Sequence, residues 1–414
     1  MRQRFIQSFS TSGTEQEALY ANDLGKPYVC FIEDGQYIDW NTLSPVVPLS
    51  AQPLTFEILS AGTIEWTASS SLTKTIQYSL NGGDWTSITS TTAGTPINVV
   101  EGDKVRFRGY NSTYADQDGW NCFIGSAYFN AYGNIMSLLD GDNFKELTAL
   151  TSANAYAFHR LFSKTKEVLV QNVPVLSGSA AYVMDASNLI LPATTLSTWC
   201  YKSMFEGTTL EAAPELPATT LADCCYRGMF CWTTNLTKGP DLPATTMAKE
   251  CYRYMYYMAT GITTAPELPA TTLAEGCYAF MFLGCTSLTK APTELPATTI
   301  PATPTTSGIY GCYHKMFQGC TSLTTAPDIL ATSFPNPGTS TTKGCCVNMF
   351  SGCTSLNHIK CLATNGSSFV PANAVYNWTM GVPTGSTGTF VKKAGASWTS
   401  GFGGIPAGWT VIEE

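Results

Sequence analysis

The segment Cys277-Tyr-Ala-Phe-Met-Phe-Leu-Gly-Cys-Thr-Ser-Leu-Thr-Lys-Ala-Pro-Thr-Glu-Leu-Pro-Ala-Thr-Thr-Ile300 is the fullest copy of a unit that recurs through the second half of the chain. Its last part, Leu-Pro-Ala-Thr-Thr, occurs five times at intervals of 25 to 27 residues, with copies that start at Leu191, Leu216, Leu242, Leu268 and Leu295. A unit of this size is too small to bury its own apolar face, so it must stack on its neighbours. The period of about 26 therefore predicts a solenoid.

Within each unit, the recurring Tyr, Met, Phe, Cys and Leu are expected to form the core. The segment Leu-Thr-x-Ala-Pro-x-Leu is predicted to be the strand, because it alternates and is closed by Pro, which cannot donate to a ladder. Stacking in register would place successive strands about 4.8 Å apart in a long parallel sheet.

The chain has 15 cysteines, an odd number that does not suggest a disulfide framework. Nine of them recur at two places in the unit: Cys200, Cys225, Cys251, Cys277, Cys312 and Cys345 at the first, and Cys285, Cys320 and Cys353 after a Gly. Regular spacing among apolar neighbours favours small buried residues stacked in a column, over disulfides between rungs. No Cys-x-x-Cys pair occurs and the three histidines are isolated, so we expect no metal.

The regions that flank the repeats differ from them in pattern. Residues 53–137 alternate with the two-residue period of strands and predict a β-sandwich of immunoglobulin-like type. Residues 1–52 form a leader whose apolar run Pro27–Trp40 predicts a hairpin around Asp34-Gly35, docked on a partner or on the next domain. The repeats fill residues 138–372, and residues 373–414, where the consensus is lost, predict a small C-terminal cap.

Composition and motifs narrow the function classes. Charged residues make up 13% of the 414 residues and the net charge is −8, which argues against nucleic-acid binding. No stretch reaches the ~18 apolar residues of a membrane span, and the N-terminus shows no secretory signal. With His159, His314 and His358 as the only histidines and no nucleotide-binding or hydrolase motif, we expect neither catalysis nor a cofactor.

Three blocks, Met281-Phe-Leu-Gly-Cys-Thr-Ser-Leu288, Met316-Phe-Gln-Gly-Cys-Thr-Ser-Leu323 and Met349-Phe-Ser-Gly-Cys-Thr-Ser-Leu356, carry a family resemblance. They resemble the Ala-Phe-x-Gly-Cys-x-x-Leu core of BspA-type leucine-rich repeats, which occur in surface proteins of gut Bacteroidetes and in their phages. The match covers roughly residues 150 to 365, with a longer period and with Met in place of the Ala before Phe. The resemblance implies binding or adhesion and carries no catalytic residues.

A repeat protein of this kind without an export signal suggests a phage particle. We therefore expect a non-enzymatic virion protein, a tail- or head-fibre-like component for host recognition, that binds a bacterial surface glycan or protein through the repeats. Its N-terminal segment would bind other virion proteins, and association with further copies of the chain is left open. The alternative is a bacterial cell-surface adhesin.

Two sets of residues are candidate binding sites. Acidic residues hold equivalent places before the Leu-Pro step or its equivalent in five units and would form a column of like charge: Glu215, Asp241, Glu267, Glu294 and Asp328. This column is either solvated, with Lys238 and Lys290 nearby, or a stripe that binds a cation or another ligand. Large aromatic and basic residues replace smaller ones at variable positions of the middle units: Arg227, Trp232, Arg253, Tyr254, Tyr257 and Phe280. These six either fill gaps between rungs or form the binding surface, since exposed rings and Arg concentrate binding energy.

Overall fold

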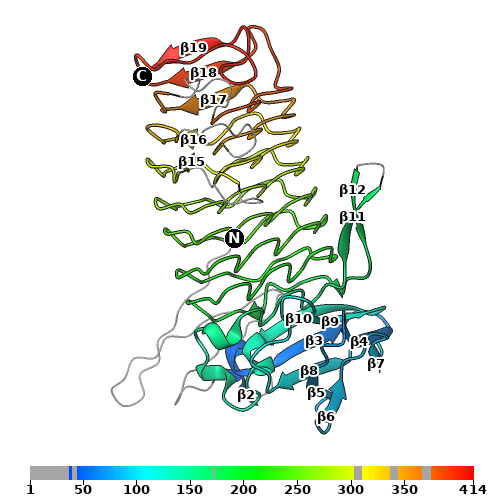
Figure 1. The fold of residues 1–414 in the computed structure, drawn as a ribbon. Coiled ribbons are helices and arrows are strands. Elements are labelled where there is room, and N and C mark those ends of the chain that lie inside the picture. Colours follow the sequence, from blue (N-terminus) through cyan, green and yellow to red (C-terminus); the bar gives the residue numbers. More distant parts are fainter. Residues whose placement is uncertain (1–36, 40–43, 171–172, 303–309, 336–343, 366–373) are drawn as a thin grey trace.

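The computed structural model describes residues 37–39, 44–170, 173–302, 310–335, 344–365 and 374–414 (Figure 1). The chain is mainly β, with several sheets and almost no helix. Four short 3-10 helices occur in the described residues: η1 (Leu49–Ala51), η2 (Ile135–Leu138), η3 (Phe144–Glu146) and η4 (Ser152–Asn154). No helix among the described residues has the length and apolar character needed to span a membrane.

The predicted hairpin around Asp34-Gly35 lies outside the described residues. Of the run Pro27–Trp40 only Tyr37–Asp39 is described: it forms β1, which pairs antiparallel with β2 (Ser44–Val46), a strand beyond that run.

Residues 54–134 form two sheets that face each other through aromatic rings. The larger sheet has the order β13-β10-β3-β8-β5-β6, and the smaller one has the order β7-β4-β9. Phe56 of the larger sheet and Phe123 of the smaller one have ring centroids 5.0 Å apart, and Phe107 lies 4.7 Å from Phe123. The strands are β3 (Leu54–Ile58), β4 (Gly62–Ala68), β5 (Thr75–Leu80), β6 (Thr86–Thr89), β7 (Thr95–Val99), β8 (Lys104–Gly109), β9 (Asn121–Gly125) and β10 (Tyr128–Asn134).

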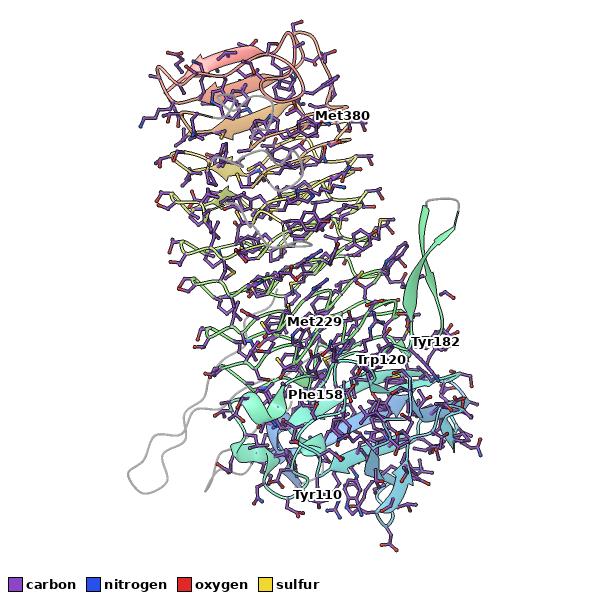
Figure 2. The ribbon with its side chains drawn as sticks, viewed as in Figure 1. Tyr110, Trp120, Phe158, Tyr182, Met229 and Met380 are labelled. Atoms are coloured by element: carbon purple, nitrogen blue, oxygen red, sulfur yellow. The ribbon has the colours of Figure 1, made fainter. Side chains whose placement is uncertain are left out.

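The larger sheet continues directly into the repeats. Strand β10 pairs in parallel with β13 (Tyr182–Val183) and with β14 (Leu189–Ile190). Near this junction, where Figure 2 shows Trp120 and Phe158, the backbone N–H of Phe123 donates to the carbonyl of Leu161 at 2.7 Å. The two regions therefore share hydrogen bonds and one continuous apolar core.

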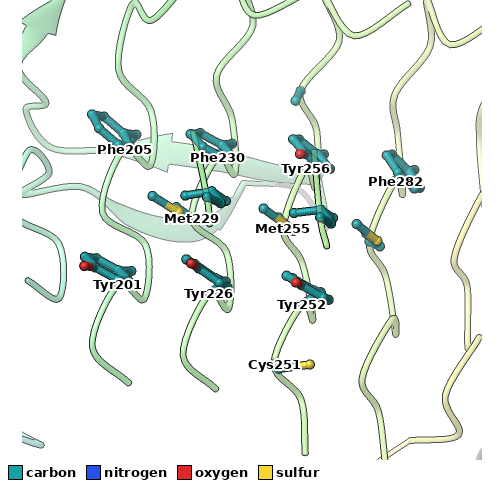
Figure 3. Close-up of a cluster of buried hydrophobic side chains, with 14 of the residues drawn as sticks. Tyr201, Phe205, Tyr226, Met229, Phe230, Cys251, Tyr252, Met255, Tyr256 and Phe282 are labelled. Atoms are coloured by element: carbon teal, nitrogen blue, oxygen red, sulfur yellow. The ribbon is translucent and has the colours of Figure 1, made fainter. Parts of the chain in front are cut away.

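The repeats stack as rungs, one on the next, and their inner side chains form columns (Figures 1 and 3). The recurrent cysteine that begins each rung, such as Cys277, is called the column cysteine and is position 0. In the rungs that flank this series Ala157 and Ala374 take its place. Aromatic rings at position +1, Phe158 and then Tyr201 to Tyr313, stack with centroids 5.5 to 6.1 Å apart. The rings at position +5, from Phe162 to Phe350, lie 5.0 to 5.8 Å apart, with a buried Met column at position +4.

The column cysteines are buried beside these rings. All 14 cysteines in the described residues are buried, which agrees with the prediction made from the sequence for the nine that recur. The second set, at position +8, is satisfied by the backbone: the thiols of Cys285, Cys320 and Cys353 donate to carbonyls of the preceding rung at 3.0 to 3.1 Å.

The backbone of each rung turns at left-handed residues spaced four apart. Between these turns the backbone N–H groups alternate between two acceptors. One N–H donates to a carbonyl of the next rung, as that of Tyr201 does to Cys225 at 2.9 Å. Another donates to the carbonyl three residues earlier in the same rung, as that of Met204 does to Tyr201 at 3.3 Å. The left-handed residues, with φ from 51° to 80°, are Tyr156, Trp199, Cys224, Glu250 and Gly276 at position −1; Arg160, Ser203, Gly228, Tyr254, Phe280, Lys315, Asn348 and Asn377 at +3; and Gly207, Trp232, Met258, Gly284, Gly319, Gly352 and Gly381 at +7.

The long parallel sheet that the sequence predicts is only partly formed. Thr264 bridges both Lys238 and Lys290 in parallel, so the expected register is present, but these are isolated bridges. The prolines of the Ala-Pro-x-Leu-Pro segment supply no N–H, which interrupts the ladder. A five-stranded parallel sheet forms toward the C-terminus: β15 (Glu294–Leu295), β16 (Asp328–Ile329), β17 (His358–Cys361), β18 (Thr389–Lys392) and β19 (Thr410–Glu413).

Two further segments complete the described chain. The hairpin of β11 (Lys166–Val170) and β12 (Val173–Ser177) stands out beside the stack (Figure 1). The segment predicted as a cap continues the rungs. The backbone N–H of Cys346 donates to the carbonyl of Ala374 at 2.9 Å, and that of Phe350 donates to the carbonyl of Trp378 at 2.7 Å. The end of the chain thus keeps the backbone pattern after the consensus sequence has disappeared.

Candidate ligand-binding groove

A groove of about 430 Å³ crosses the outer face of the middle rungs. Every residue that lines it comes from position +2, +3, +6 or +7 of a rung, from Arg160 at one end to Lys315 at the other. These positions lie outside the core because the +1, +4 and +5 side chains occupy the inside. The groove therefore runs along the stack axis and is built from six successive rungs.

The structure brings the six predicted aromatic and basic residues together. Five of them line the groove: Arg227, Trp232, Tyr254, Tyr257 and Phe280. The sixth, Arg253, is buried behind the rings, with its guanidinium carbon 4.8 Å from the centre of Tyr254 and 5.4 Å from that of Phe280.

The four rings form one continuous aromatic floor. Trp232 meets Tyr257 edge-on with centroids 6.0 Å apart, and Tyr257 meets Tyr254 edge-on at 5.4 Å. Tyr254 in turn stacks on Phe280 at 4.6 Å. Phe280 is buried, whereas Trp232, Tyr254 and Tyr257 are partly exposed. Padding of the core therefore explains Phe280 but leaves the exposed faces of the other three rings unexplained.

Three of these rings occupy backbone positions that disfavour them. Trp232, Tyr254 and Phe280 have φ of 61°, 61° and 62°. At position +7 five other rungs carry Gly, and at position +3 later rungs carry Asn, the residue types that adopt this conformation readily. A bulky side chain there costs about 1–2 kcal/mol. Other bulky residues, such as Met258, also adopt this conformation outside the groove, but among the described rungs aromatic rings at positions +3 and +7 occur only here, which motivates a functional reason for keeping them.

Two buried carboxylates hold the arginines of the groove in place. Glu250 accepts from Arg227 at 2.7 Å and also from Arg253. Glu206 accepts from Arg160 at 2.9 Å. Both carboxylates are only 5% exposed, so these pairs fix the guanidinium groups more firmly than surface ion pairs would.

Two lysines of the groove have no such carboxylate. Among the described residues, neither Lys202 nor Lys315 forms an ion pair. The Lys202 amine lies 4.5 Å from the ring centre of Trp199, and that of Lys315 lies 5.9 Å from Phe280. Burial, with smaller contributions from Arg227 and Arg160, lowers the pKa of Lys202 to about 8. Burial also lowers the pKa of Lys315.

The acidic column lies elsewhere and is solvated. Glu215, Asp241, Glu267 and Glu294 are exposed, and Asp328 is half-buried beside Lys360, which it pairs with at 3.2 Å. Register pairing of Glu294 with Asp328 places neighbouring members on adjacent strands, as predicted.

Neither Lys238 nor Lys290 forms an ion pair with the column in the described part of the chain. Glu215 and Asp241 line a separate hollow of about 530 Å³. Within the described residues, no cluster of three or more His, Cys, Asp or Glu could hold a metal ion. The acidic column therefore offers exposed carboxylates alone, whereas the groove combines aromatic rings with fixed arginines. The groove is the stronger candidate for a binding site.

Sequence reasoning missed several residues of the groove. Lys202 and Lys315 hold the same variable positions of the repeat as Arg227 and Tyr254, but a single basic residue there does not stand out from the consensus. Arg160 belongs to a degenerate first rung, and the buried Glu206 and Glu250 give no sign in the sequence that they anchor arginines.

No family model, no curated protein and no solved structure matches this chain. The function of the groove is therefore inferred from its geometry.

Proposed function

We propose that the chain is a non-enzymatic recognition protein that binds a ligand on a bacterial surface through the groove. The observation that carries this is the aromatic floor, in which Trp232, Tyr254 and Phe280 are held at left-handed positions, +3 and +7, where no other described rung carries an aromatic ring. The fold alone does not require rings there. Partly exposed rings flanked by Arg are the side chains that concentrate binding energy in interfaces.

The architecture that goes with this proposal is a leucine-rich-repeat solenoid of BspA type over residues 138–372. An immunoglobulin-like sandwich at 53–137, a cap at 373–414 and an attachment segment at 1–52 complete it. The stacked columns, the period and the Gly-Cys-Thr-Ser-Leu blocks support the solenoid assignment. The two facing sheets support the sandwich assignment.

We place this protein in a phage particle, as a tail- or head-fibre-like component, with a bacterial surface adhesin as the alternative. The resemblance of the repeats to those of phage and surface proteins of gut Bacteroidetes supports both locations. Mass spectrometry of purified particles, compared with the bacterial surface fraction from the same culture, separates them. Recovery with portal and tail proteins supports the virion, and recovery only with the cell envelope supports the adhesin.

A binding assay with intact bacteria tests the recognition function. The full chain carries a fluorescent label, and the double variant Trp232→Ala/Tyr254→Ala is compared with Phe402→Ala. Phe402 is 57% exposed and lies outside the groove, so it controls for loss of any surface ring. We expect the double variant to bind more than tenfold more weakly and Phe402→Ala to bind normally. Normal binding by a correctly folded double variant would exclude the groove.

A further inference from the structure

The groove has a distinct distribution of charge along its length. Arg160, Lys202 and Arg227 lie toward one end, the rings lie in the middle, and Lys315 lies at the other end. The carboxylates of Glu206 and Glu250 pair with arginines, which leaves the two lysines as the cations without an acidic partner in the described residues. A local excess of positive charge in a chain of net charge −8 favours an anionic ligand.

The rings between the cations select a ligand with flat apolar faces. Trp232, Tyr254 and Tyr257 are partly exposed rings, which lose little conformational entropy on binding. The rungs follow one another at short intervals along the axis, since their buried rings at position +1 lie 5.5 to 6.1 Å apart. A linear glycan laid along the groove would therefore meet Trp232 on one rung and Tyr254 and Tyr257 on the next.

We propose that the groove binds a linear acidic oligosaccharide, with sugar faces on Trp232, Tyr254 and Tyr257 and anionic groups at Lys202 and Lys315. This inference rests on the proposed recognition function and names the ligand class of the same site. The anionic groups are the carboxylates of uronic acids or sulfate esters, which share the chemistry that an ammonium group recognises.

Single-stranded nucleic acid is the other polyanion that aromatic grooves bind. The buried Glu206 and Glu250 would lie close to a continuous row of phosphates. In addition, Tyr254 and Phe280 are already stacked on each other at 4.6 Å, which leaves no gap between them for a base. A sugar ring can lie flat on an aromatic face and needs no such gap, so an acidic glycan fits this surface better.

Calorimetric titration of the full chain tests the inference. The probes are a hexamer of galacturonic acid, a sulfated heparan hexamer, the neutral maltohexaose and a single-stranded oligonucleotide. We expect at least one acidic hexamer to bind tenfold more tightly than maltohexaose, and the better of the two identifies the anionic group. Equal binding of the neutral hexamer, or tighter binding of the oligonucleotide, would overturn the proposal.

Variants of the two lysines provide the matched test. Lys202→Gln/Lys315→Gln is expected to lose the preference for the acidic hexamer while keeping the weak binding of the neutral one. The control, Lys238→Gln/Lys290→Gln, removes two exposed lysines outside the groove and should bind as the parent does. An unchanged preference in the folded groove variant would also overturn the proposal.

The two levels of inference fail in different ways. If Trp232→Ala/Tyr254→Ala abolishes binding to bacteria but no acidic preference is found, the ligand class is wrong and the recognition function stands. If that variant binds bacteria normally, the recognition function of the groove is itself wrong.

Discussion

Two middle rungs and two late rungs of the stack have nearly the same inner face but different outer faces. The middle rungs begin at Cys225 and Cys251, and the late rungs begin at Cys312 and Cys345. Position +5 carries Phe230 and Tyr256 in the middle rungs and Phe317 and Phe350 in the late ones, all buried. At the left-handed positions, the middle rungs carry Trp232 and Tyr254, whereas the late rungs have Gly at +7 and Lys315 or Asn348 at +3. The comparison separates what stacking requires from what it merely tolerates.

On the outer face the fold imposes a backbone conformation and leaves the side-chain type open. All these rungs share the left-handed turns, so the residue types that adopt them most readily should be found wherever nothing else is selected. Late rungs largely follow that expectation, and middle rungs depart from it where the groove lies.

Replacement of a stacked ring should have the largest effect on the free energy of unfolding. That effect should be the same in the middle and the late rungs. Phe230→Ala and Phe317→Ala each remove a fully buried ring from the same column, so each should lower stability by about 3–5 kcal/mol. Chemical denaturation, monitored by circular dichroism, measures the free energy of unfolding of both variants. A difference of more than about 2 kcal/mol between them would show that the inner faces are not equivalent.

Replacement of the cysteines should come next. Cys277→Ser places a hydroxyl in a buried column, at a cost of about 1–3 kcal/mol. Cys320→Ser should cost less, because the thiol of Cys320 already donates to the carbonyl of Phe282 at 3.1 Å and a hydroxyl can do the same.

A thiol reagent gives an independent measurement on the same cysteines. Burial raises the pKa of Cys277 to about 12, so its thiol should react only after denaturation, when both the inaccessibility and the high pKa are lost. Rapid reaction of the native protein, or a melting temperature that falls sharply on adding reductant, would contradict the buried, reduced column.

An exchange at position +3 addresses the outer faces directly. Tyr254→Asn should change stability by less than about 1 kcal/mol, since relief of left-handed strain offsets the lost ring contacts. Binding to bacteria should nevertheless fall at least tenfold. The reverse change, Asn348→Tyr, should lower stability by about 1–2 kcal/mol with no effect on binding. The melting temperature and the binding to bacteria are measured for both variants. If Asn348→Tyr stabilised the protein, a tyrosine at position +3 would not be strained.

The smallest expected effect is on the pH dependence of binding. Lys202 has a pKa of about 8, lowered by burial and by Arg227 and Arg160 against the smaller opposing influence of Cys224 and Glu206. Its ammonium group is mostly charged at pH 7 and mostly neutral at pH 9. Affinity for an acidic hexamer should therefore fall about threefold as pH rises through 8. Lys202→Gln should show a flat profile over this interval; a fall that persists in the variant would assign the titration to another group.

The aromatic groove could be predicted in part because repeats make departures visible. Trp232 and Tyr254 stand out from the consensus, so their position in one patch follows from the period. Lys202, Lys315 and Arg160 could not be recognised in the same way, because a single basic residue at a variable position is ordinary. Their importance comes from neighbours contributed by other rungs.

The parallel sheet shows a second limit. The expected register is present at Thr264, yet continuous strands form only near the C-terminus. Alternation and spacing predict which residues face each other, but the number of ladder bonds depends on how the prolines of adjacent rungs coincide. The C-terminal segment shows the converse, since backbone bonds from Cys346 and Phe350 carry the rungs onward without the consensus.

The repeat, its period and the identity of the core residues can be read from the sequence, because a small unit can bury its apolar side chains only by stacking on copies of itself. Which outer residues meet depends on how the rungs stack in three dimensions. Trp232, Tyr254 and Phe280 come from three successive rungs, and their contacts depend on the offset and twist between those rungs. The same is true of Glu250, which joins Arg227 and Arg253 across a rung boundary. Local propensity sets no such distance; the stacked backbone does.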